Sequence, residues 1–244
     1  MTEPGNASDG SAGWRVKFAT TLNSLAVEPG FLTEEWLAGR RARWLRPFAV
    51  FLFCTGAYFI TDPLVTRVVR VHQVAAEAMP FPPDARSALE AMGARERLGD
   101  DRFNRIVADI GALSVKIGGT LGDAAPRIMF AFMPLFALLT WLAWRDTLRR
   151  YSAHLTLSLH VHAAWFGSMA VASLAPLTRS SIIDVLAGLA VLVYSTWYCG
   201  VAFKRVLGGT SMQLFARTTI VGVVYAFGIM AAMLATIAFA ILTY

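Results

Sequence analysis

The stretch HLTLSLHVHAAWF, residues 154–166, contains three of the four histidines of this 244-residue chain. It opens an apolar run that continues through Ala175. Ionisable side chains are costly inside an apolar segment of membrane length, and by default they mark a functional site. We therefore expect this stretch to lie in a membrane-spanning helix, and we treat its histidines as candidate site residues.

The composition favours a membrane protein. Hydrophobic residues make up 56% of the chain and charged residues 16%, whereas an ordinary soluble domain has about 25% charged residues. The net charge is +6, but the basic residues cluster beside apolar runs, which favours contact with anionic lipid over nucleic acid binding. Cys54 and Cys199 form no CxxC pair, so no disulfide framework or zinc ribbon is predicted.

The apolar runs predict an all-α integral membrane protein, a helical bundle of five transmembrane helices. The expected spans are 47–65, 128–144, 152–177, 182–203 and 218–244. Residues 66–127 are polar, and their apolar stripe from Phe103 to Ile117 predicts a helical extracytoplasmic insert. Gly118-Gly119 and Gly122 are expected to break its helix before Pro126.

The segment before the first span divides into a tail and a helical part. Residues 1–13 are rich in Gly, Ser, Asn and acidic side chains, which is typical of a disordered tail. Residues 14–46 predict cytoplasmic interfacial helices on the membrane surface, with a small soluble cap as the alternative. The first helix has an apolar stripe at Trp14, Phe18, Leu22 and Leu25. Thr33 is expected to cap the second, with Trp36 and Leu37 on its apolar side.

Basic residues in the short loops predict the orientation of the spans. Residues 145–150 contain three arginines, and residues 204–217 contain three more basic side chains. The short loop on the other side has only Arg179. This asymmetry predicts a cytoplasmic N-terminus and an extracytoplasmic C-terminus.

Helical geometry separates the histidines, because each residue turns by about 100°. His154, Ser158 and His162 share one face, whereas His160 points elsewhere. His154 and His162 lie about 12 Å apart along the axis, too far for one metal ion. Polar packing, a ligand or proton site, and a metal or haem site all stay open. The last would need ligands from a second copy, since no other span contains a histidine, and we predict no cofactor.

A basic cluster borders the spans on the expected cytoplasmic side. Its members are Arg40, Arg41, Arg43, Arg46, Lys204 and Arg205. Basic residues beside a span fix its orientation in the membrane, and this role alone would account for the cluster. Guanidinium groups also bind phosphate well, so a lipid phosphate is the alternative ligand. Tyr194 and Tyr198 are expected at a similar depth to His154 and His160, so they are further candidate contacts of a ligand.

No Ser-His-Asp, GxSxG, P-loop or paired-carboxylate motif occurs, so we predict no catalytic residue. We expect a non-enzymatic accessory or assembly factor that binds a membrane protein partner or anionic lipid headgroups. The alternative is a small-solute or ion carrier, or a membrane enzyme, that uses the histidine-bearing span. Ala163 and Gly167 would let another helix approach closely, so a homo-oligomer also stays open.

Four motifs, in order, resemble an uncharacterised bacterial membrane family classed as a domain of unknown function. They are Thr21-Leu22 through Pro29-Gly30-Phe31, the run GRRARWLRP at 39–47, residues 154–163, and Tyr198 with Phe203-Lys204-Arg205-Val206. Members of that family typically pair an N-terminal zinc-ribbon segment with five spans. The resemblance covers about residues 20–240 and implies a five-span fold in a bacterial inner membrane. It implies no reaction. This chain lacks the cysteine pairs, so no zinc role is carried over.

Overall fold

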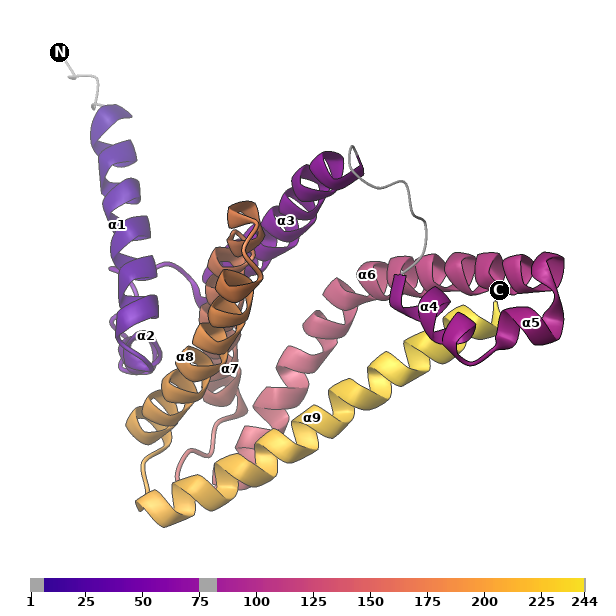
Figure 1. The fold of residues 1–244 in the computed structure, drawn as a ribbon. Coiled ribbons are helices and arrows are strands. Elements are labelled where there is room, and N and C mark those ends of the chain that lie inside the picture. Colours follow the sequence, from indigo (N-terminus) through magenta and orange to yellow (C-terminus); the bar gives the residue numbers. More distant parts are fainter. Residues whose placement is uncertain (1–6, 75–82, 244) are drawn as a thin grey trace. The chain divides into compact units, whose positions relative to one another are not determined.

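A computed structural model of the chain describes residues 7–74 and 83–243, and these are helical with no strand among them (Figure 1). Five helices are long and apolar enough to cross a membrane. They are α3 (Pro47–Val74), α6 (Asp100–Trp144), α7 (Tyr151–Ala172), α8 (Ser181–Leu207) and α9 (Ser211–Leu242). The predicted all-α membrane bundle with five spans is confirmed.

The described residues form two compact units. The first comprises the chain as far as Val69 together with Ala131–Tyr225, and the second comprises Arg70–Phe130 together with the chain from Ala226 onward. Helices α6 and α9 each contribute residues to both units. The candidate site residues named above all belong to the first unit.

Helix α7 is the core of the first unit. In its most apolar stretch 61% of the residues are buried, against 6–28% in the corresponding stretches of the other four long helices. Small or slender side chains such as Ala153, Ser158 and Ala163 let neighbouring helices approach it closely. The histidine-bearing span is therefore the most enclosed of the five long helices.

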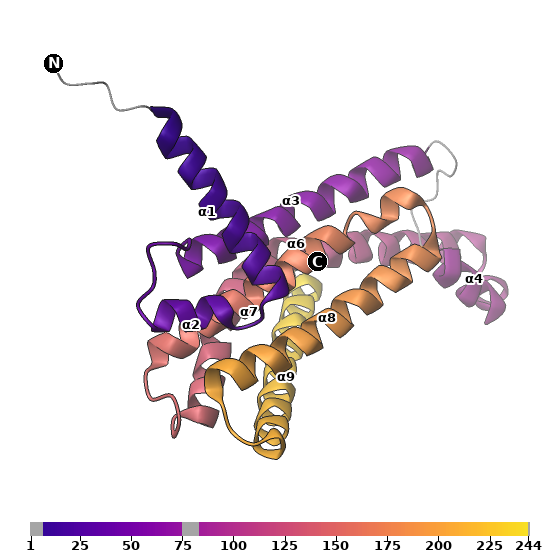
Figure 2. The same ribbon diagram turned by 90° about the vertical axis from the view of Figure 1, so that its left-hand side faces the viewer.

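Two shorter helices precede the first span. Helix α1 (Ala7–Val27) is joined by a tight turn to α2 (Phe31–Leu37), and α2 contacts both α7 and α8. Figure 2 shows α1 crossing the direction of α3 and α8 instead of running beside them. Such a crossing suits a helix at the end of a bundle, as expected of an interfacial helix.

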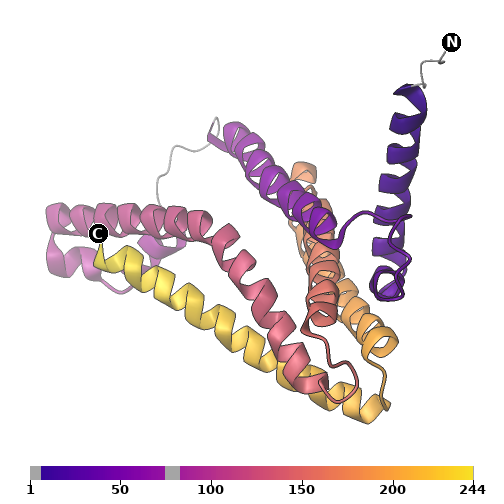
Figure 3. The same cartoon turned by 180° about the vertical axis from the view of Figure 1, so that it is seen from behind.

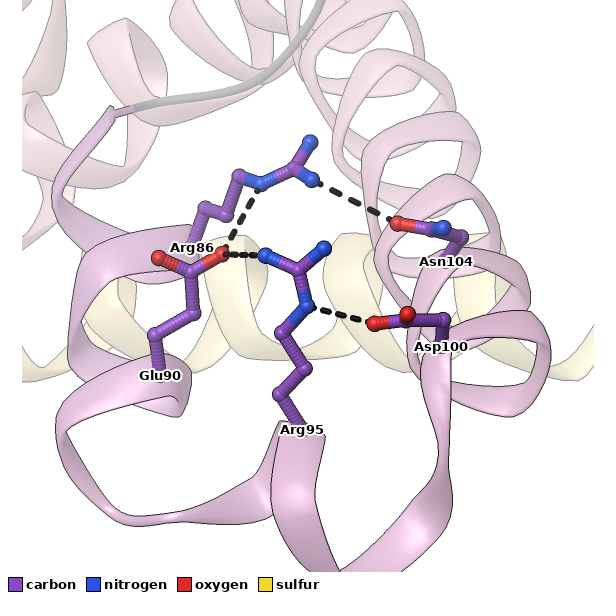
Figure 4. Close-up of polar contacts among 5 residues, drawn as sticks. All are labelled: Arg86, Glu90, Arg95, Asp100 and Asn104. Carbon is purple, nitrogen blue, oxygen red and sulfur yellow. Dashed lines mark hydrogen bonds and ion pairs between the residues drawn. The ribbon is translucent and has the colours of Figure 1, made fainter.

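Together with the end of α3 and the second half of α9, the second unit contains α4 (Pro83–Ala91), α5 (Ala94–Leu98) and α6 as far as Phe130. A polar cluster joins them: Arg95 donates to Asp100 over 2.6 Å, and Arg86 donates to Glu90 over 3.3 Å (Figure 4). Both guanidinium groups lie 5.9 Å from the ring centre of Phe103, which is buried. The last turns of α9 lie beside α6 (Figure 3), where Lys116 donates to the Thr243 carbonyl.

Several helix bounds differ from those expected. Helix α1 begins at Ala7, so residues 7–13 are not the predicted disordered tail, and residues 1–6 lie outside the described part. Helix α3 continues through Pro63 to Val74, beyond the expected end at 65.

Helix α6 is continuous across Gly118-Gly119, Gly122 and Pro126, where a break separating 66–127 from 128–144 was expected. Glycine and proline are tolerated in apolar helices because without water the backbone has few alternative partners.

The ends of the last three spans also differ. Helix α7 stops at Ala172, before a short 3-10 turn η1 (Ala175–Thr178) that contains Pro176, whereas its end was expected at 177. Helix α8 extends four residues past 203 to Leu207, because Lys204 and Arg205 suit the negative end of the helix dipole. Gly208, at φ 66°, then ends it. Helix α9 begins at Ser211 instead of 218.

Candidate functional site

His162 links α7 to α9. Its Nδ1 lies 2.8 Å from the Ser158 carbonyl oxygen, which can only accept, so Nδ1 carries the ring proton. In the neutral ring Nε2 is then an acceptor, and the Tyr225 hydroxyl donates to it over 2.8 Å. Ser158 completes this row by donating to the Met133 carbonyl of α6 over 2.8 Å. His162 therefore belongs to a buried polar row that joins α6, α7 and α9.

His160 points to a different element. Its Nδ1 lies 2.8 Å from the hydroxyl oxygen of Thr33 in α2, and both side chains are buried. Thr33 was expected to cap α2, but α2 begins at Phe31 with Gly30 as its cap, so Thr33 is inside the helix. The hydroxyl faces α7 because α2 docks on the bundle by its Leu32, Thr33 and Glu35 side, while Leu37, on the predicted apolar side, is exposed.

His154 supports the turn between α6 and α7. Its Nε2 donates to the Leu148 carbonyl over 2.9 Å. Its Nδ1 is buried and has no hydrogen-bond partner among the described residues. His154 therefore fixes the start of α7 by a local contact.

The three histidines do not converge. They contact the turn before α7, α2 and α9, each a different part of the first unit. Within the ranges that the structure describes, no three His, Cys, Asp or Glu side chains are grouped so as to hold a metal ion. The geometry is that of interhelical polar packing.

The turn between α1 and α2 docks closely on α8. Gly30 has φ +80°, and a Cβ at this position would lie 3.0 Å from the Ala202 Cα and 3.1 Å from the Ala202 carbonyl oxygen. Arg205 donates to the Pro29 carbonyl over 3.1 Å and pairs with Glu34 at 3.2 Å. Only glycine combines this backbone conformation with so close an approach.

A second carboxylate fixes the turn that follows α2. Glu35 accepts hydrogen bonds from Arg40 (2.8 Å from Nε) and from Trp44 (3.2 Å from Nε1). The hydrogen bond from Arg40 lowers the pKa of the Glu35 carboxyl below its ordinary value, although burial opposes this. Residues 14–46, which we call the collar, are thus held by polar contacts to each other and to α7 and α8.

The predicted basic cluster divides into two groups. Arg40 and Arg205 are paired with Glu35 and Glu34. Arg41, Arg43, Arg46 and Lys204, which we call the basic group, are exposed and make no ion pair with any described carboxylate. Arg41 instead donates to the Trp36 carbonyl and lies 5.0 Å above its ring.

The two candidate tyrosines also serve the collar. The Tyr194 hydroxyl donates to the Ala26 carbonyl over 3.0 Å. Tyr198 is buried, and its hydroxyl interacts with the Gly30 backbone. Both tyrosines therefore hold α8 against the end of α1.

One ion pair was missed in the sequence. Arg217, near the start of α9, forms a bidentate ion pair with Asp146 in the turn before α7. Its Nη1 and Nη2 donate to Oδ1 and Oδ2 over 2.9 and 2.8 Å. The hydrogen bonds from Arg217 hold the pKa of Asp146 below its ordinary value. The single acidic residue in a basic turn was the available signal, but sequence does not indicate that α9 supplies its partner.

Comparisons with known proteins assign one part of the chain. The family model described as "Protein of unknown function (DUF3667)" matches residues 16–59, which cover nearly all of the collar and the first half of α3. No curated protein and no solved structure matches the chain. A domain of unknown function is therefore present at 16–59. Its match does not extend to the five spans, nor does it bear on the zinc ribbon of the family that the sequence resembles.

Proposed function

We propose that this chain is a non-enzymatic accessory or assembly factor of a bacterial inner membrane, with its N-terminus in the cytoplasm, and that its basic group binds anionic lipid headgroups. The observation that carries this proposal is that Arg41, Arg43, Arg46 and Lys204 are exposed and form no ion pair within the described residues. Exposed basic side chains beside a membrane span are attracted to anionic lipids by about 1 kcal/mol each.

The positions of these side chains support a lipid phosphate as the ligand. Arg43 and Arg46 flank Trp44, which is held by Glu35, and Arg46 directly precedes the first turn of α3. A membrane span that begins at Pro47 would hold these guanidinium groups at headgroup depth. The guanidinium fork then matches phosphate oxygens.

The histidine span supports the non-enzymatic part of the proposal. A catalytic or transport site needs side chains that converge on a common space. Thr33 and Tyr225 form hydrogen bonds with the ring nitrogens of His160 and His162 that face other elements. The three histidine rings contact three different parts of the first unit and not one common space.

The test is lipid-dependent stability. The purified protein in a neutral detergent is titrated with short-chain phosphatidylglycerol or phosphatidylcholine while thermal unfolding is followed. A ligand at one hundred times its Kd stabilises by about 2.7 kcal/mol. We expect stabilisation by phosphatidylglycerol that diminishes with added salt.

A triple variant, Arg43→Gln with Arg46→Gln and Lys204→Gln, should lose most of this stabilisation. The matched control is Arg97→Gln with Arg102→Gln and Arg105→Gln, which removes the same charge from exposed positions in the second unit. Equal stabilisation by both lipids, or equal loss in both triple variants, would contradict the lipid assignment. A protein that co-purifies in constant ratio and binds through the basic group would identify a membrane partner instead.

A further inference from the structure

Helices α3, α7 and α8 line an open apolar groove in the first unit, and the last turns of α1 contribute to its wall. Its volume is about 900 Å³, and ligand sites commonly have about 300–1,000 Å³. Small side chains such as Ala57, Gly167 and Ala190 leave this space open, and no charged residue lines it.

A smaller pocket of about 350 Å³ lies at the other end of the groove. The two cavities share lining residues, among them Ala172, Ala175 and Ala187, so they adjoin each other. The only charged residues that line the smaller pocket are Asp62 of α3 and Asp184 of α8. A hydrogen bond of 3.0 Å between Thr61 and Ser173 joins α3 to α7 beside it.

No described residue supplies these two carboxylates with a counter-charge. Neither forms an ion pair with any residue that the structure describes, and no Lys, Arg or His lines the pocket. Both side chains are exposed, but two like charges that line one pocket repel each other. A cation bound beside them would offset this repulsion, whereas a phosphate would be repelled.

The geometry points to a binding site for a single-chain membrane amphiphile with a cationic amine head. We propose that the amine lies between Asp62 and Asp184 and that its apolar tail fills the groove toward Tyr194. This site differs from the basic group in position and takes a ligand of opposite charge. It therefore does not rest on lipid binding by the arginines.

The experiment uses the full chain in phosphatidylcholine nanodiscs with radiolabelled dodecyltrimethylammonium as the probe. We expect saturable binding at one site, and weakening by about tenfold in Asp62→Asn or Asp184→Asn, because each substitution removes one attractive charge near the amine. Asp109→Asn and Asp123→Asn, exposed carboxylates of the second unit, are the matched controls and should bind as the natural chain does. Ala187→Phe, which fills the groove, should also weaken binding.

The natural chain alone supplies an independent measurement should a variant fold poorly. Dodecanol, which has the same tail without charge, should compete at least tenfold more weakly than unlabelled dodecyltrimethylammonium. Equal competition by dodecanol would overturn the proposal, because the groove would then be selecting only an apolar tail. Unchanged affinity in both Asp→Asn variants would overturn it as well, as would displacement of the probe by phosphatidylethanolamine at equal concentration.

Discussion

Helices α7 and α9 are both long enough to span a membrane, but they stand at opposite ends of the range of polarity and burial. Helix α7 is the least apolar of the five spans and has 61% of its most apolar stretch buried, whereas α9 is the most apolar and has 6% buried. A helix that faces lipid must be apolar, while a helix enclosed by other helices can carry polar groups that bond across to them. In this protein the polar residues of a span therefore indicate packing, and the apolar ones indicate contact with lipid.

A large side chain added to α7 and to α9 should have very different effects on stability. Ala163 of α7 is fully buried, and Ala235 of α9 is exposed. Ala163→Phe should destabilise the protein by up to about 3 kcal/mol, because extra atoms in a packed core force its neighbours apart. Ala235→Phe should change the free energy of unfolding by less than about 0.5 kcal/mol. Reversible unfolding in mixed detergent measures both, and equal effects would mean that α7 is not the core.

The docking of the collar can be tested at two glycines. Gly30 and Gly39 both have positive φ, but only Gly30 lies against another helix. Gly39→Ala should cost about 1 kcal/mol for the backbone conformation alone. Gly30→Ala should cost about 1–3 kcal/mol more, because its Cβ meets Ala202. Unfolding and limited proteolysis between α1 and α2 distinguish the two variants, and similar losses would argue against close docking.

The polar link between α7 and α9 is expected to have a smaller effect. His162→Phe and Tyr225→Phe each remove one partner of the 2.8 Å hydrogen bond. Interhelical hydrogen bonds in membranes contribute about 0.6 kcal/mol on average, and up to about 1.7. A double-mutant cycle on the free energy of unfolding should therefore give a coupling of about 1 kcal/mol. Additive effects of the two substitutions would show that the bond does not hold α9.

The smallest effect concerns pH. Arg217 lowers the pKa of Asp146 below its ordinary value of 3.8. The pair therefore stabilises the fold fully above about pH 5, and this contribution is lost as the pH falls below 3.8 through the lowered pKa. We expect the thermal midpoint of Asp146→Asn to fall less between pH 5 and pH 3 than that of the natural chain. An identical fall in both would contradict the role of this pair.

The sequence predicted the features that depend on local pattern and missed those that depend on distant contacts. The five spans and the separation of His160 from His162 follow from apolar runs and helical periodicity. The role of Thr33 did not follow, because a threonine early in a helix is a typical cap, and only the docking of α2 turns it toward His160. The ion pairs of Arg40 with Glu35 and of Arg205 with Glu34 did not follow from the sequence either. The second pair joins residues of two different helices, α8 and α2.

The unbroken helix α6 does not follow from the sequence, because glycine and proline break helices in water but are tolerated in apolar helices. Asp62 and Asp184 lie 122 positions apart, so sequence alone does not place them in one pocket. Their signal was only that each is the single carboxylate of an apolar run. Both residues are thus visible in the sequence as boundary residues, without any indication that they line one pocket.

We infer that the histidines of α7 hold neighbouring elements together, and the Thr33–His160 hydrogen bond tests this role most directly. Thr33→Val and His160→Leu each remove one partner of a buried hydrogen bond between the DUF3667 domain and the core of the bundle. A double-mutant cycle on the free energy of unfolding, measured in mixed detergent, should give a coupling of about 0.6–1.7 kcal/mol. A coupling near zero, with both single variants as stable as the natural chain, would contradict the structural role of His160.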